Sequence, residues 1–254
     1  MSFPNTVYGK PGWEKVITSK QQHKLGTRMA FADGRVFRYA SNSTAAAIAA
    51  GRLVQAPATD TGDDENIAVS AAVAAGGTKV TSGTSQTLTL DQYKEGYLYI
   101  NDNAGEGQVY QVKGNTAVSG ASGGIFEIDE EDGFNIALTT SSEFGVVYNP
   151  YDKIIVQPQS LTNAAVGVST TTITQSTSSV TYYTWVQTWG ICALLDTGAT
   201  WVVGDQLASA ETGADGAAIL LDSSAAPDNQ SIGYSMYIKP ATTEFGIMML
   251  TIAP

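Results

Sequence analysis

The segment Leu194 to Ala199, which reads LLDTGA, is the strongest candidate in this sequence for a group of residues that could support a reaction. An aspartate held on a loop by neighbouring Thr and Gly can share a proton with a second aspartate and so activate a water molecule. Asp196, Thr197 and Gly198 supply these residue types in the required order. In such a mechanism two subunits would each contribute one Asp196.

The same motif also suits an ordinary hairpin turn. It looks like the active-site signature of retroviral-type aspartic proteases, but only 58 residues follow Asp196, fewer than a lobe of such a protease uses. The late hydrophobic-hydrophobic-Gly element of that fold has one weak match, Ile232-Gly233, which comes too early. In a turn, Asp196 would accept hydrogen bonds from nearby backbone and Gly198 would take a positive φ. Because a short motif outside its structural context is only a hypothesis, we favour the turn.

Other catalytic and metal-binding chemistry is disfavoured by the residue counts. His23 and Cys192 are the single histidine and the single cysteine, so a triad would have to use His23, and zinc would lack its usual three or four ligands. The acidic segments 60–65 and 129–132 lack the spacing of an EF-hand loop and are interpreted as solvated turns. The glycine-rich segment 114–124 lacks the Gly-Lys-Ser or Gly-Lys-Thr ending of a phosphate-binding loop. We therefore predict no enzyme, no cofactor and no metal site.

Charge is distributed unevenly along the 254 residues. The net charge is -11, but residues 1–52 hold eight basic residues against two acidic ones, Glu14 and Asp33. Such a basic segment can pair with the acidic part of another copy, with an acidic partner or with phosphate. Nucleic acid is the weakest of these, since the acidic remainder would repel it. No apolar run approaches the ~20 residues that cross a bilayer, and no signal-peptide stretch is seen, so we expect synthesis in the cytoplasm and no membrane partner.

Alternating apolar residues and Gly, Asn and Asp turns predict strands over most of the chain. We predict an all-β fold, a β-barrel or β-sandwich with an extended N-terminal arm over residues 1–26 and little helix. Asp33-Gly34 predicts a hairpin, and Ala45–Ala50 predicts one or two helical turns. In the strand around 183–195, a spacing of two or four predicts one shared face for the residues Trp185, Trp189, Ile191, Ala193 and Leu195.

We divide the chain into three segments on these patterns. Residues 1–57 hold the arm and a capping hairpin, 58–157 form a β domain, and 158–254 form a C-terminal barrel-like domain. The polar break at 59–66 and Pro158 mark the boundaries.

The order of several motifs resembles the head decoration, or cement, proteins of tailed phages. The likeness runs from about residue 24 to the end. It is carried by LGTRMAFADGRVFRYAS with AAAIAAGRLVQAP, GYLYINDNAGEGQVYQVKGN, NPYDKIIVQP, YYTWVQTWGICALL with VVGDQLASAETGADGA, and a closing IGYSM. Each motif alone is weak, and their order is the specific part.

The resemblance implies a β-rich protein on the outer surface of a virion capsid. It implies a homotrimer that ties neighbouring major capsid protein subunits together and has no catalytic residues. The alternatives are a tail or baseplate protein, a carbohydrate-binding module and an aspartic protease. We expect the basic arm and hairpin to make the interface, through Trp13, Lys15, Lys24, Arg28, Arg35, Phe37, Arg38 and Tyr39.

Overall fold

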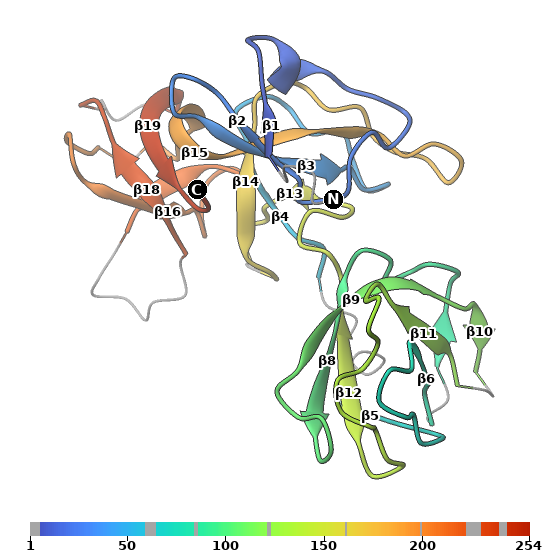
Figure 1. The fold of residues 1–254 in the computed structure, drawn as a ribbon. Helices are drawn as coiled ribbons and strands as arrows, with labels where there is room; N and C mark the ends of the chain where they lie inside the picture. Colours follow the sequence, from blue (N-terminus) through green and yellow to red (C-terminus); the bar gives the residue numbers. More distant parts are fainter. Residues whose placement is uncertain are drawn as a thin grey trace. The chain divides into compact units, whose positions relative to one another are not determined.

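The computed structural model describes residues 6–58, 65–83, 86–120, 123–160, 162–198, 200–221, 230–238 and 243–254. The chain forms two compact units (Figure 1). Unit 1 combines residues 1–58 with 150–254, and unit 2 holds residues 59–149. Each unit is described by itself below.

The predicted all-β fold is confirmed, since the described secondary structure is strand apart from one 3-10 turn. Unit 1 holds β1 (Thr6–Tyr8), the turn η1 (Trp13–Lys15), β2 (Arg28–Ala30), β3 (Val36–Ser41), β4 (Leu53–Gln55), β13 (Ile155–Val156), β14 (Ala165–Ser169), β15 (Tyr183–Leu195), β16 (Gln206–Ser209), β17 (Ala218–Leu220), β18 (Ser231–Ser235) and β19 (Phe245–Thr251). Unit 2 holds β5 (Ile67–Ala68), β6 (Lys79–Thr81), β7 (Thr87–Leu88), β8 (Tyr97–Asp102), β9 (Val109–Asn115), β10 (Val118–Ser119), β11 (Ile125–Ile128) and β12 (Glu143–Val147). No described helix is long and apolar enough to cross a bilayer.

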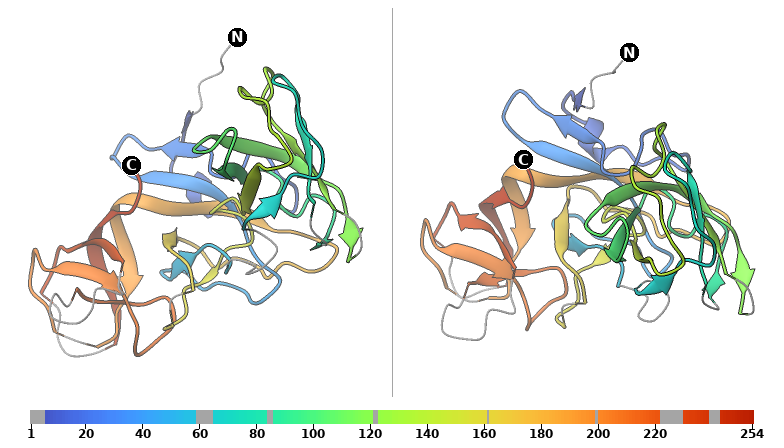
Figure 2. Two further views of the ribbon diagram at one scale, coloured as in Figure 1. Left: turned by 90° about the horizontal axis from the view of Figure 1, so that it is seen from below. Right: turned by 60° about the horizontal axis from the view of Figure 1, so that its bottom comes forward.

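Unit 1 is organised by one 11-stranded sheet. Eight strands follow the order β1-β2-β3-β15-β19-β18-β16-β17, and β14 joins β15 to β4, which pairs with β13. Strands from the two ends of the sequence therefore lie side by side, as the blue and orange strands of unit 1 show (Figure 2). The segments 1–57 and 158–254 share this sheet instead of forming separate units, because β3 pairs along β15. A pairing between such distant segments has no local signal in the sequence.

Unit 2 is built from a six-stranded sheet and a two-stranded one. The larger sheet has the order β5-β12-β8-β9-β11-β6, and the smaller one pairs β10 with β7. Side chains alternate between the two faces of a strand, so every second residue of β8 and β9 points into the core over most of each strand. The resulting core is aromatic and packs Tyr93, Phe126, Phe134 and Phe144 with aliphatic neighbours.

The N-terminal segment is not an arm that stands away from the fold. In its described part, β1 pairs in parallel with β2, and the backbone of Thr18 exchanges hydrogen bonds with Tyr183 of β15. The carboxylate of Glu14 is buried, and its Oε1 lies 3.9 Å from Arg35 Nη1. These contacts hold residues 6–26 against unit 1.

Two local predictions have opposite outcomes. The Asp33-Gly34 hairpin is confirmed, since β2 and β3 pair in antiparallel register and Gly34 has φ 87°. The short helix over Ala45–Ala50 is wrong, because no helix forms there. Instead, the backbone of Ile48 exchanges two hydrogen bonds with Ile173, so a long-range pairing overrides the alanine propensity.

The predicted shared face of β15 is also wrong. Ile191 is 52% exposed and Ala193 is exposed, while the intervening Cys192 and Leu194 are buried. The register against β3 shifts between Gln187 and Trp189, and a shift of one residue exchanges the two faces of a strand. Both faces of this strand are apolar, so the residue types alone did not distinguish inside from outside.

Truncating the aromatic core of unit 2 tests this packing. We expect Phe144→Ala to lower the free energy of unfolding by about 3–5 kcal/mol, since Phe144 is fully buried and its removal leaves a cavity. Ile136→Ala, in the same unit but about half exposed, is the matched control and should change it by less than about 1 kcal/mol. Urea unfolding followed by circular dichroism measures both, and equal effects would contradict the assigned core.

Candidate partner-binding surfaces

Asp196 lies in a closed turn. Its Oδ1 accepts hydrogen bonds from the backbone N–H of Gly198 at 3.0 Å and of Glu244 at 3.2 Å. Its Oδ2 accepts one from the hydroxyl of Tyr237 at 3.3 Å, and the side chain is buried. Gly198 has φ 92°, so both features expected of the turn are confirmed. Donors from its own chain thus surround this carboxylate on both oxygens.

Tyr237 shares this environment. Burial, followed by the nearby negative charge of Asp196 and the hydrogen bond to it, raises the pKa of the phenol from 10.0 to about 12. The neutral phenol is therefore the form that the fold stabilises, and that stabilisation is present below pH 10 and lost as the pH rises toward 12.

The predicted interface residues separate into three groups. Phe37 and Tyr39 are buried in a cluster with Met29, Phe31 and Trp185, and their place in an interface stays a prediction from the sequence. Period-two alternation on β3 directs them inward, and a buried aromatic ring offers little area to a partner. Phe37 therefore supports the surface from below, while Tyr39 also lines a pocket that is described below.

Arg35 and Arg38 form the second group, because their guanidinium groups are engaged within unit 1. Arg35 pairs with Asp33 at 2.8 Å and lies over the ring of Phe31, 5.0 Å from its centroid. Arg38 donates to the carbonyl oxygens of Gly26 at 3.2 Å and Pro254 at 3.0 Å. Their first role is therefore to fix the hairpin and the N-terminal segment.

The remaining four residues are accessible. Lys15 and Lys24 are exposed, Arg28 is partly exposed on β2, and Trp13 is 45% exposed at the start of η1. They are spread along the N-terminal segment and the first hairpin strand. This segment therefore presents cations to solvent while its backbone is held against the sheet.

A pocket of about 370 Å³ lies between the N-terminal segment and the sheet of unit 1. We call it the aromatic pocket. Val7, Trp13, Val16, Thr18, Gln22, His23, Tyr39 and Trp185 line it. The sequence placed His23 in an arm, but the fold brings its ring to 5.3 Å from the centroids of both Tyr39 and Trp185.

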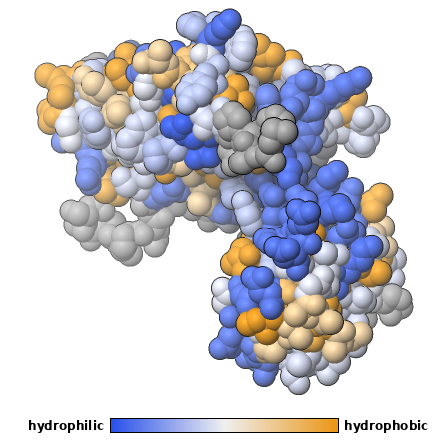
Figure 3. Space-filling view, in the orientation of Figure 1, coloured by the Kyte–Doolittle hydropathy of each residue, from blue (hydrophilic) through white to orange (hydrophobic). Residues whose placement is uncertain are grey.

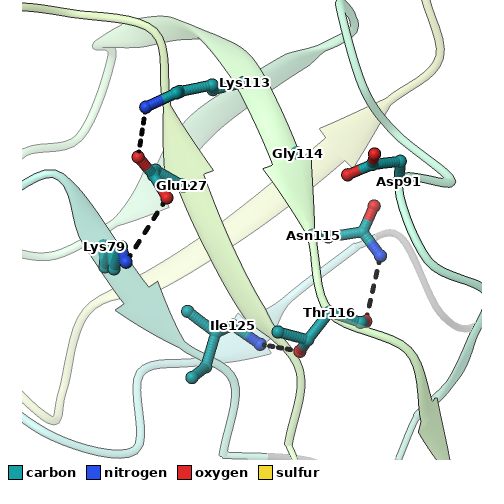
Figure 4. A pocket seen from close by; sticks show the side chains of 8 residues that line it. All are labelled: Lys79, Asp91, Lys113, Gly114, Asn115, Thr116, Ile125 and Glu127. Atoms are coloured by element: carbon teal, nitrogen blue, oxygen red, sulfur yellow. Dashed lines mark hydrogen bonds and ion pairs between the residues drawn. The ribbon is translucent and has the colours of Figure 1, made fainter.

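A second pocket, of about 320 Å³, lies in unit 2 on β6, β9 and β11 (Figure 4). Glu127 lies between two lysines, with Lys113 at 2.6 Å and Lys79 at 3.4 Å. The hydrogen bond from Lys113 lowers the pKa of Glu127 and raises that of Lys113. Asp91 lies close above Gly114, where a Cβ would come within 2.5 Å of its Oδ1. Glu127 and Asp91 together balance the charges of Lys79 and Lys113, so the lining of this pocket has no net positive charge.

The outer face of β15, β19 and β18 is apolar, and sequence reasoning missed it. Antiparallel pairing places side chains in cross-strand rows on one face. One row is Ile191, Met249 and Tyr234; the next is Ala193, Ile247 and Met236, and Phe245 lies at the end of the face. We call these seven residues the outer apolar face. On the visible side of unit 1, apolar residues lie among polar ones (Figure 3).

This face is unusual because the opposite face of the same strands already forms a core. Cys192, Leu194, Met248 and Leu250 point inward and are almost fully buried. An antiparallel sheet with one buried face ordinarily carries polar residues on the other. The sequence did contain the signal, since the run FGIMML on β19 is apolar at nearly every position, as expected of a strand covered on both faces.

The two units differ in charge. Unit 2 contains fourteen Asp and Glu residues against three lysines, which is a net charge of -11. Unit 1 contains ten acidic and ten basic residues and is neutral overall. All of the net charge of the chain therefore belongs to unit 2, and the outer apolar face belongs to the neutral unit.

Among the described residues, no group of three or more His, Cys, Asp or Glu could hold a metal ion. Residues 60–64 of the first acidic segment lie outside the described residues. Neither a family model nor a curated protein nor a solved structure matches this chain. The resemblance to decoration proteins therefore stays a prediction from the sequence motifs.

Substituting Asp196 separates a structural turn from a reaction centre. We expect Asp196→Asn to cost about 1–3 kcal/mol of folding free energy, since an amide has one acceptor oxygen for three buried donors. The pKa of Tyr237 should fall from about 12 but stay above 10, because burial is its largest cause. Urea unfolding and NMR titration of labelled tyrosine measure these changes. A proteolytic activity that this substitution abolishes would contradict the turn.

Deleting residues 1–26 tests whether the N-terminal segment is part of unit 1. We expect a loss of about 3 kcal/mol or more, because Val7 and Leu25 pack on the cluster around Phe37 and the buried Glu14 supports Arg35. The control for charge is the full-length chain with the exposed Lys10, Lys15 and Lys20 replaced by Gln. Its free energy of unfolding should change by less than about 1 kcal/mol. Thermal unfolding measures both. An unchanged melting temperature after the deletion would mean that the segment is an independent arm.

Proposed function

We propose that this protein is a non-enzymatic structural component of a tailed-phage virion that binds the outer surface of the capsid as a decoration protein. The outer apolar face is the observation that carries the proposal. Its partner would be the major capsid protein, with no nucleic acid and no membrane involved. The order of the sequence motifs supports the choice of a phage shell over other assemblies.

The outer apolar face supports adhesion on physical grounds. Ile191, Ile247 and Phe245 are each about half exposed, and their neighbours in the rows carry no charge. Covering a half-exposed side chain of this size contributes about 1 kcal/mol. Soluble monomers rarely expose contiguous apolar patches, and large patches of this kind mark interaction sites. A partner with an apolar surface would therefore gain several kcal/mol here.

The charge difference supports the same assignment. Unit 2 carries the whole net charge of -11, which disfavours burial against another acidic surface and promotes solubility. Unit 1 is neutral and can approach a partner without this repulsion. The exposed Lys15 and Lys24 and the partly exposed Arg28 are cations of the same unit that can pair with acidic groups of a partner.

A decoration protein acts by linkage. A protein that binds only the assembled shell shifts the equilibrium toward that state, and many copies with modest interfaces sum to a large stabilisation. In the proposal three copies associate, as the resemblance implies, and native mass spectrometry of the purified chain measures this number. A tail or baseplate location is the alternative, and electron microscopy of particles made with and without the protein distinguishes the two.

Polar substitutions on the outer apolar face test the proposal. We expect Ile191→Lys combined with Ile247→Lys to weaken binding to purified capsids at least tenfold, because two charges would have to be desolvated, and tenfold corresponds to about 1.4 kcal/mol. Val109→Lys on β9 of unit 2, with similar exposure, is the matched control. Occupancy is measured by co-sedimentation with particles, and circular dichroism verifies the fold. Full occupancy of the double variant would refute attachment through this face.

A further inference from the structure

The aromatic pocket has the properties of a ligand site that shell attachment does not use. Its walls come from two parts of unit 1, the N-terminal segment and the strands β3 and β15. The outer apolar face is built by β15, β18 and β19, and no residue of that face lines the aromatic pocket. A volume of about 370 Å³ is within the usual range of small-molecule sites.

The pocket is held open by contacts that fix its walls. Glu14, next to Trp13, is buried, and its backbone carbonyl accepts a hydrogen bond from Thr170 Oγ1 at 3.0 Å. The carbonyl of Val16 accepts one from Thr184 Oγ1 at 3.3 Å. The backbone that follows Trp13 is therefore fixed at two points, while the ring of Trp13 stays about half exposed. A wall fixed before binding lowers the entropy cost of binding.

One side of the pocket is apolar and aromatic. Trp13 offers an accessible ring, and Val7 and Val16 extend the apolar wall beside it. Trp185 and Tyr39 form the base, with their ring centroids 5.0 Å apart at 63°. A ligand here needs an apolar face that can lie against an indole ring.

The other side is polar and has unused hydrogen-bonding capacity. Thr18, Gln22 and His23 line it. Thr18 Oγ1 and Gln22 Nε2 already donate to the backbone carbonyl of Lys20, at 2.9 Å and 3.2 Å, so the capacity left for a ligand is that of the Gln22 side-chain oxygen and of His23. The hydroxyl of Tyr39 is engaged, since it accepts from the backbone N–H of Gln22 at 3.1 Å and lies 3.3 Å from Thr18 Oγ1. No hydrogen bond joins the imidazole of His23 to another described residue. A ligand with hydroxyl groups along one edge would satisfy these groups.

The described lining residues include no Asp, Glu, Lys or Arg. A charged ligand would therefore enter without a partner of opposite sign, which is costly in a half-buried site. An aliphatic ligand would leave the imidazole of His23 unsatisfied. These constraints select a neutral molecule with one apolar face and one hydroxylated edge.

We propose that the aromatic pocket binds a neutral pyranose unit of a glycan, stacked on Trp13 and hydrogen-bonded by Gln22 and His23. A pyranose ring presents C–H groups on one face and hydroxyl groups around its rim, which matches the two sides of the pocket. The protein would then carry two separate surfaces in unit 1, one for assembly and one for sugar. A side chain of a protein partner is the competing occupant, and the experiment below separates it.

The test uses the isolated full-length chain. The probes are glucose, galactose, mannose and N-acetylglucosamine, and the β1,4-linked trisaccharides of glucose and of N-acetylglucosamine. NMR follows the indole N–H signals of tryptophan and the ring signals of His23 during titration. We expect saturable shifts of both with at least one probe at millimolar concentration. Trp13→Ala should weaken that binding about tenfold or more.

Controls keep the outcome interpretable. Tyr8→Ala removes an exposed aromatic of the same segment that does not line the pocket, and it should leave binding unchanged. Because Trp13→Ala could loosen the segment, Gln22→Ala and His23→Ala provide a second test, and each should weaken binding about threefold or more. Absence of binding to every probe, or binding that these variants do not change, would overturn the proposal.

The remaining outcome concerns a protein occupant. If no sugar binds while Trp13→Ala abolishes attachment to capsids, the aromatic pocket is a contact site for the shell and the sugar proposal fails. Capsid binding that depends on Ile191 and Ile247 is measured separately, so each proposal can fail without the other.

Discussion

Unit 1 depends on one long strand, β15, which lies between β3 and β19 in the sheet and also pairs with β14. Its first half pairs with β3 and its second half with β19, and Trp189 at the junction pairs with both. Trp189 therefore has β3 on one edge and β19 on the other, and at this point the register against β3 shifts between Gln187 and Trp189 and Gly190 adopts φ 91°. A Cβ at Gly190 would lie 3.0 Å from Arg35 Cα, so the close approach of the hairpin at this point also requires glycine. Through this strand, the N-terminal and C-terminal segments form one sheet.

The two halves of β15 support different surfaces. Beside β3, Trp185 closes the base of the aromatic pocket, and the N-terminal segment lies against the strand through Thr18 and Tyr183. Beside β19, the strand is apolar on both faces, with Cys192 and Leu194 inside and Ile191 outside. One element thus positions both the proposed sugar site and the proposed assembly face.

Charge and apolar surface are separated between the two units. The acidic unit 2 encloses an aromatic core, and in its pocket Glu127 and Asp91 together balance the charges of Lys79 and Lys113. The neutral unit 1 leaves a sheet face uncovered. This division fits a protein in which one unit adheres and the other maintains solubility. Neither surface requires the carboxylate of Asp196, whose role is to close a turn.

The sequence by itself determined the all-β class, the Asp33-Gly34 hairpin and the turn at Asp196, since strand alternation and turn chemistry are local properties. Only the tertiary structure decided which segments share a sheet, which side of β15 faces solvent and that His23 lies beside Trp185. Those outcomes depend on pairing between residues more than a hundred positions apart and on a one-residue register shift. A strand that is apolar on both faces carries no pattern that distinguishes its inside from its outside.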